Sequence, residues 1–129
     1  MPKLNNYFNI KWLVLAVTFA ATVLLLTHIP QELMPSQLQE SGLEQLLHVV
    51  AYGAITFLFI LSVKSSFSLR SALLVLFALL AIGIIDEITQ PLVNREASLT
   101  DLAANVIGIV TVLLYSVVSK CRFRNTNTE

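Results

Sequence analysis

Residues 69–88 read LRSALLVLFALLAIGIIDEI, an apolar run that ends in two adjacent acids, Asp86 and Glu87. About 20 helical residues cross the hydrocarbon core of a bilayer, so this run is long enough to span it. Three more apolar runs, 10–26, 43–63 and 102–118, have the same length or nearly so. Because only short connections separate the runs, we predict an all-α fold, a four-helix transmembrane bundle. The helices are expected near residues 10–28, 43–63, 69–90 and 100–118.

The composition supports a membrane protein. The chain has 129 residues, of which 56% are hydrophobic and 12% are charged, whereas soluble domains carry about 25% charged residues. These values disfavour a soluble enzyme, and they exclude a disordered chain and a nucleic-acid binder with a large basic surface. With one cysteine, a disulfide scaffold is excluded too. Because no linker or repeat is evident, we expect residues 1–129 to form a single domain.

The first apolar run has two interpretations. Lys3 and Lys11 precede it, as basic residues precede the core of a secretory signal peptide. However, no small-x-small cleavage site follows the run, which continues as Thr27-His28-Ile29-Pro30. We therefore predict a retained first span.

The distribution of charge predicts the orientation in the membrane. Seven of the eight basic residues lie in the N-terminal tail, the second connection and the C-terminal tail: Lys3, Lys11, Lys64, Arg70, Lys120, Arg122 and Arg124. Seven of the eight acids lie in or beside the first and third connections: Glu32, Glu40, Glu44, Asp86, Glu87, Glu96 and Asp101. By the positive-inside rule, the N-terminus and the C-terminus are both cytoplasmic.

Polar residues gather at the outer ends of the last three helices. They recur at about one helical turn within each helix and so share a face: Glu44, His48 and Tyr52; Asp86, Glu87 and Gln90; Asp101 and Asn105. Since charged groups at membrane depth cost several kcal/mol, we expect them to face one another or a water-filled cavity. Structural interpretations stay open: Ser41 with Glu44 and Ser98 with Asp101 fit capping boxes, and the other side chains suit helix packing.

This set of side chains fits two kinds of chemistry. His48 with Glu87 could act as an acid/base pair, and a histidine with carboxylates could also bind a divalent metal. The sequence identifies no cofactor and does not decide whether a metal binds. No HExxH or GxSxG motif is present. Cys121 lies at the predicted cytoplasmic end, across the membrane, which excludes a catalytic Cys/His pair.

Two segments together resemble a known family. Residues 43–52 read LEQLLHVVAY and residues 86–108 read DEITQPLVNREASLTDLAANVIG, a pattern similar to that of the VanZ-like family of small bacterial membrane proteins. The resemblance covers all but the first helix and the tails, and it departs from the family at Gln45, usually Lys, and at Asn94, commonly Gly. Asparagine tolerates a positive φ better than most residues. The resemblance implicates His48, Tyr52, Glu87, Gln90, Arg95, Asp101, Asn105 and Gly108.

The resemblance implies a cell-envelope role in the bacterial inner membrane, because the name-giving member is associated with resistance to the glycopeptide teicoplanin. We expect an outward-facing polar site that binds or modifies a lipid-linked or cell-surface ligand, such as an envelope glycan with an anionic headgroup. His48, Glu87 and Asp101 are the acid/base or ligand residues, and the ligand-binding residues are Tyr52, Asp86, Gln90, Arg95 and Asn105. The alternatives are a structural or assembly subunit of a membrane complex and an oligomeric transporter or channel subunit. Membrane lipid and a second copy of the chain are the other expected partners, and nucleic acid is not one.

Overall fold

The structure is a computed structural model that describes residues 8–35, 42–63 and 68–126, with side chains described as far as Ser119. It contains four long helices, α1 (Ile10–Thr27), α3 (Leu43–Ser62), α4 (Leu69–Thr89) and α5 (Leu99–Thr126). Two short 3₁₀ helices, η2 (Gln31–Leu33) and η3 (Gln90–Val93), follow α1 and α4. All four long helices are apolar and long enough to cross a membrane. This confirms the predicted all-α fold with four helices that are long and apolar enough to span a membrane.

Seven of the eight helix bounds agree with the prediction to within one residue, and only the end of α5 differs by more. Helix α4 ends at Thr89 and the chain continues as η3, because Pro91 lacks an N–H and restricts the residue before it. Helix α5 begins at Leu99 and continues to Thr126, well beyond the predicted end at residue 118. Residues 109–126 contain neither glycine nor proline, and lysine and arginine are good helix formers. The helix therefore outruns its apolar segment.

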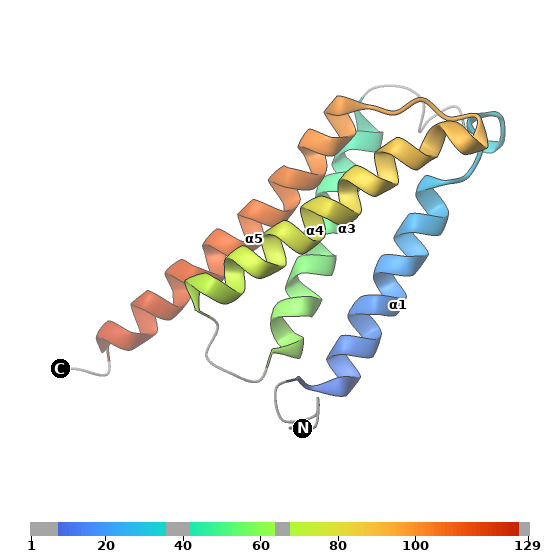
Figure 1. The fold of residues 1–129 in the computed structure, drawn as a ribbon. Coiled ribbons are helices and arrows are strands. Elements are labelled where there is room, and N and C mark those ends of the chain that lie inside the picture. The colour runs from blue at the N-terminus through green and yellow to red at the C-terminus, as the bar shows by residue number, and fades with distance from the viewer. Residues whose placement is uncertain (1–7, 36–41, 64–67, 127–129) are drawn as a thin grey trace.

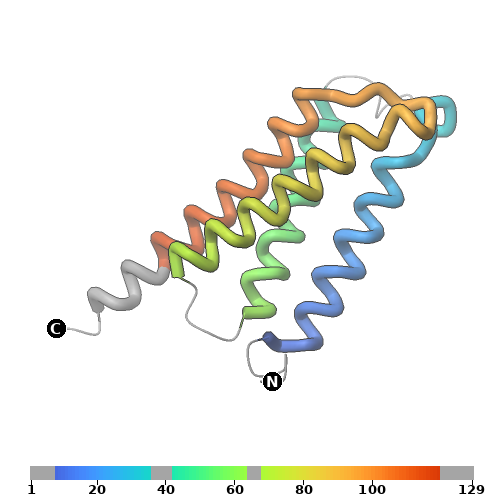
Figure 2. The backbone as a smooth tube through the Cα atoms, in the orientation of Figure 1, coloured from blue at the N-terminus to red at the C-terminus, as the bar shows by residue number. Residues whose placement is uncertain are grey.

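Helix α3 is the central element of the bundle, since it packs along α5 on one side and against α1 on the other, while α4 lies mainly along α5 (Figures 1 and 2). The core of buried apolar side chains includes Tyr52, Ile55, Leu79, Ile109 and Leu113. Large apolar side chains also cover the outside of all four helices, as lipid-facing helices require.

Helices α3 and α5 cross at glycines. A Cβ atom on Gly108 would collide with the carbonyl oxygen of Val49 and lie 3.0 Å from the backbone nitrogen of Gly53. The two backbones therefore touch at this point, as small residues allow in membrane helices. This close crossing lies about one turn from His48 on α3 and from Asn105 on α5, so it sets how near those two side chains come.

The polar residues of all four helices meet at one end of the bundle. The helices alternate in direction, so α1 and α4 end where α3 and α5 begin, and the start of α1 and the end of α5 lie at the opposite end (Figure 1). The orientation of this end relative to the cytoplasm stays a prediction. Some residues on which this prediction rests are not described by the structure. These are Lys3, Glu40 and Lys64, together with the side chains of Lys120, Cys121, Arg122 and Arg124.

The two expected capping boxes have different outcomes. The Ser98 hydroxyl accepts a hydrogen bond from the backbone N–H of Asp101 at 3.2 Å, as predicted. The backbone N–H of Ser98, however, donates to Glu87 Oε2 at 2.9 Å rather than to Asp101. At the start of α3, the N-cap residue is Gly42 with φ 72°, and no side chain caps it. Ser41 lies outside the described residues.

Candidate functional site

A cavity of about 430 Å³ lies between α1 and α3 at the polar end of the bundle. Apolar side chains form most of its wall, among them Phe19, Val23, Leu26, Leu47, Val50 and Ala51. At its polar end the wall is formed by three side chains that can carry charge: Glu44, His48 and Arg95. The shape therefore suits a ligand with one long apolar part and one polar part.

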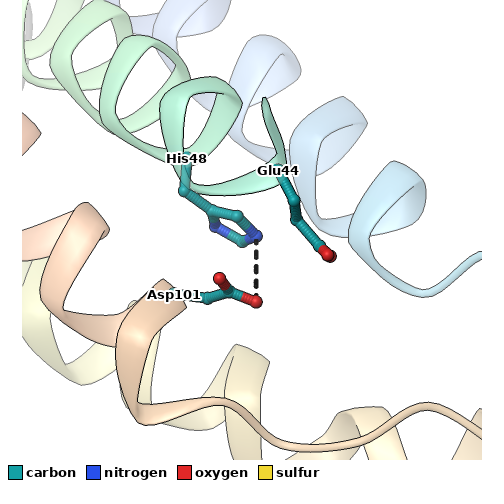
Figure 3. A group of neighbouring side chains, drawn as sticks. All are labelled: Glu44, His48 and Asp101. Atoms are coloured by element: carbon teal, nitrogen blue, oxygen red, sulfur yellow. Dashed lines mark ion pairs between the residues drawn. The ribbon is translucent and has the colours of Figure 1, made fainter. Parts of the chain in front are cut away.

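His48 occupies a defined position at the polar end. The side chain is 5% exposed, and its Nδ1 lies 2.9 Å from the Asn105 side-chain oxygen. Because an amide oxygen only accepts hydrogen bonds, Nδ1 carries the proton in this contact. The other nitrogen, Nε2, points toward α5 and lies 3.9 Å from Asp101 Oδ2 (Figure 3). Asn105 thus orients the imidazole with Nε2 directed at the carboxylate.

Asp101 opens α5 and is 3% exposed. Its Oδ1 accepts a hydrogen bond of 2.8 Å from the Gln45 side-chain amide. Potential ligand atoms of Glu44, His48 and Asp101 all lie within 4.8 Å of one another (Figure 3). One imidazole nitrogen and two carboxylates from two helices therefore converge beside the cavity, and this is a donor set that a divalent transition metal accepts.

Arg95 reaches the same place from the loop after η3. Asn94 adopts the left-handed conformation, with φ 58° and ψ 42°, and this reverses the chain immediately before Arg95. The guanidinium donates to the backbone oxygen of Thr27 at 2.8 Å and forms an ion pair with Glu44. Burial lowers the pKa of Arg95 and the Asp101 carboxylate raises it, and an arginine stays protonated near neutral pH. The loop thus delivers one permanent positive charge to the polar end.

A second polar cluster surrounds Asp86, which is fully buried. Its Oδ1 accepts a hydrogen bond of 2.6 Å from the Thr27 hydroxyl, and its Oδ2 lies 3.4 Å from the Tyr52 hydroxyl. His28 Nδ1 lies 3.4 Å from Asp86 Oδ1, while His28 Nε2 contacts the Thr89 hydroxyl at 2.9 Å. The cluster joins α1, α3 and α4, and both carboxylate oxygens have partners within the protein. It suits a structural role.

Glu87 lies next to Asp86 on α4, and Gln90 is the first residue of η3, but both bind differently from Asp86. Glu87 Oε2 accepts from the backbone of Ser98, while Glu87 Oε1, both polar atoms of the Gln90 amide and Asn105 Nδ2 are buried without a partner among the described residues. Within that part of the chain, no hydrogen bond or ion pair joins Glu87 to His48. The structure thus pairs His48 with Asn105 and Asp101 and leaves Glu87 at the start of α5.

The expected site residues therefore divide into groups. His48 and Arg95 line the polar end of the cavity, and Asp101 and Asn105 contact His48 beside it. Tyr52 and Asp86 belong to the second cluster. Sequence reasoning placed Glu44 on the polar face with His48 and left a capping role open. It gave no role to five residues that take part: Gln45, Thr27, His28, Leu24 (through its carbonyl) and Thr89. The position of Thr27 and His28 at the outer end of the first apolar run was the available signal.

The comparisons with known proteins leave the family open. No known protein family matches the chain, and no curated protein or solved structure is similar to it.

Proposed function

We propose that this chain is a multi-pass protein of the bacterial inner membrane that binds a lipid-linked ligand of the cell envelope in the cavity between α1 and α3. The observation that carries the proposal is the shape and lining of the cavity, which is apolar along its wall and ends at Glu44, His48 and Arg95. An acyl or isoprenoid chain fits the apolar part, and an anionic headgroup fits the polar end, where Arg95 can donate further hydrogen bonds.

The resemblance of residues 43–52 and 86–108 to the VanZ-like family supports the envelope role. In this proposal the polar end faces outward, because the basic residues flank the opposite end of the bundle. A protein that holds an envelope lipid there fits the association of the family's name-giving member with resistance to the glycopeptide teicoplanin.

The distribution of polar groups favours binding over transport. The buried polar residues in the other half of α3 are Thr56 and Ser62, and each hydroxyl donates to a backbone oxygen of its own helix, of Tyr52 and of Phe59 respectively. Neither hydroxyl lines the cavity. A path through the membrane would need polar groups in both halves, or a second copy of the chain to supply them.

The test is to fill the cavity. Ala51 lines the cavity, whereas Ala81 is an exposed residue of α4 that does not. The full chain and the variants Ala51→Phe and Ala81→Phe would be purified in mild detergent, and co-purifying lipids would be identified by mass spectrometry. We expect a specific lipid with the wild-type protein and with Ala81→Phe, and its loss from Ala51→Phe. Equal lipid content in Ala51→Phe, with thermal stability unchanged, would refute the proposal.

A further inference from the structure

The first observation concerns the charged groups at the polar end of the cavity. Two carboxylates, Glu44 and Asp101, lie there against a single guanidinium, that of Arg95, which is already paired with Glu44. The Asn105 side-chain oxygen accepts a hydrogen bond from Nδ1 of His48, so Nε2 is the ring nitrogen that faces the carboxylates. An anionic headgroup would meet these two carboxylates in a place of low dielectric constant.

The second observation concerns the Nε2 nitrogen of His48. It is nine-tenths buried, and within the described residues its Nε2 makes no hydrogen bond; Asp101 Oδ2, at 3.9 Å, is its ion-pair partner there. Figure 3 shows Nε2 directed at the space beside the Asp101 and Glu44 carboxylates. His48 also lines the cavity, so this nitrogen is available to an ion that binds between the two carboxylates.

We infer that Glu44, His48 and Asp101 bind a divalent transition-metal ion, for which Zn²⁺ is the best match. Zinc takes a histidine nitrogen and carboxylate oxygens at about 2.0–2.2 Å, so tetrahedral ligand atoms lie roughly 3.3–3.6 Å apart. The 3.9 Å between His48 Nε2 and Asp101 Oδ2 needs only a small contraction to reach this spacing. Magnesium, which prefers oxygen ligands and retains water, fits a site with an imidazole poorly.

The surroundings of the three ligands have the form of a metal site. Asn105 accepts from Nδ1 and so fixes the tautomer and the ring orientation, and the Gln45 amide holds Asp101 Oδ1. A carboxylate has two oxygens, so Glu44 can keep its contact with Arg95 while it binds the ion. Three protein ligands leave a fourth position for water or for a group that enters from the cavity.

This inference deepens the proposed function and rests on it for its biological meaning. A divalent cation reverses the sign of the charge at the polar end, and together with Arg95 it would bind a phosphate or carboxylate headgroup. Metal binding itself depends only on the three ligands and is measured without any lipid. The two proposals can therefore fail separately.

The metal test uses the full chain in detergent micelles after treatment with a chelator. Zn²⁺ and, separately, Mg²⁺ would be titrated into the protein by isothermal titration calorimetry. We expect one Zn²⁺ per chain, Mg²⁺ bound at least 100-fold more weakly, and a 10-fold or greater loss of Zn²⁺ affinity in His48→Gln. His28→Gln is the matched control, because it removes the other histidine, which lies in the Asp86 cluster, and it should bind Zn²⁺ like the wild type. Equal Zn²⁺ affinity in His48→Gln and the wild type would overturn the inference.

A second variant covers failure of His48→Gln to fold. Asp101→Asn removes the charge of a second ligand at nearly constant size, and we expect it to lower the Zn²⁺ affinity at least 10-fold. That loss supports the inference, and Zn²⁺ affinity equal to that of the wild type in folded Asp101→Asn overturns it. If Zn²⁺ binds but Ala51→Phe keeps its lipid, the metal site stands and the lipid proposal fails. If Zn²⁺ does not bind but Ala51→Phe loses its lipid, the lipid proposal stands and the metal site fails.

Discussion

The replacement of Gly108 by alanine tests the close crossing of α3 and α5. The added methyl group would collide with the backbone oxygen of Val49 and lie 3.0 Å from the backbone nitrogen of Gly53. Backbone atoms cannot rotate away as a side chain can, so the two helices must separate by roughly an ångström to reach ordinary contact. Such overpacking costs about 1–3 kcal/mol in proteins.

Gly53→Ala is the matched control on the facing helix. There the new methyl group would meet the Gly108 carbonyl oxygen at 3.6 Å, an ordinary contact. Both variants gain about 0.5–1 kcal/mol of helix preference over glycine. The difference between them therefore isolates the collision, and we expect Gly108→Ala to be less stable than Gly53→Ala by about 1–3 kcal/mol.

The same variant has a consequence at the candidate site. His48 and Asn105 lie about one turn from the crossing, and the 2.9 Å contact between them would exceed hydrogen-bonding distance if the helices moved apart by about an ångström. Thermal unfolding in detergent measures the stability, and Zn²⁺ titration reports on the site. Equal melting temperatures for Gly108→Ala and Gly53→Ala would show that the described crossing is not present.

Three further predictions concern other parts of the molecule. Thr27→Val removes the 2.6 Å hydrogen bond to Asp86 and should lower stability in a thermal unfolding assay by about 1 kcal/mol, with Zn²⁺ binding retained. Loss of Zn²⁺ binding at unchanged stability would contradict the structural role of that cluster. Asn94 has a φ of 58°, a conformation that glycine adopts freely and a β-branched residue does not. Asn94→Gly should therefore be tolerated, whereas Asn94→Val should cost about 1–2 kcal/mol of unfolding free energy. Equal stability of the two variants would argue against this turn. In spheroplasts, a membrane-impermeant maleimide should label Glu96→Cys but not the native Cys121, and the reverse result would invert the predicted orientation.

Much of the fold could be predicted from the sequence because it depends on local properties of the chain. Hydropathy and length gave the four helices, and the alternation of direction placed the polar residues of α3, α4 and α5 at one end. The left-handed conformation of Asn94 also agrees with the tolerance expected of asparagine. These features need no knowledge of which helix touches which.

The partners within the site needed the tertiary structure. Helical spacing puts Glu87 and Asp86 on adjacent faces of α4, but it does not say which neighbour each face meets. In the structure α4 lies mainly along α5, so Glu87 binds the backbone at the start of α5, while Asp86 meets Thr27 of α1. The crossing at Gly108 brings α3 and α5 together, and for that reason His48 meets Asn105 and Asp101.

The sequence by itself therefore determined that this chain forms four helices long and apolar enough to span a membrane, with polar groups gathered at one end, since both follow from apolar length and periodicity. Only the tertiary structure decided that these groups form two separate clusters and that one of them borders a cavity between α1 and α3. The physical reason is that hydropathy acts on each helix alone, whereas helix rotation and backbone contact at small residues decide which side chains meet.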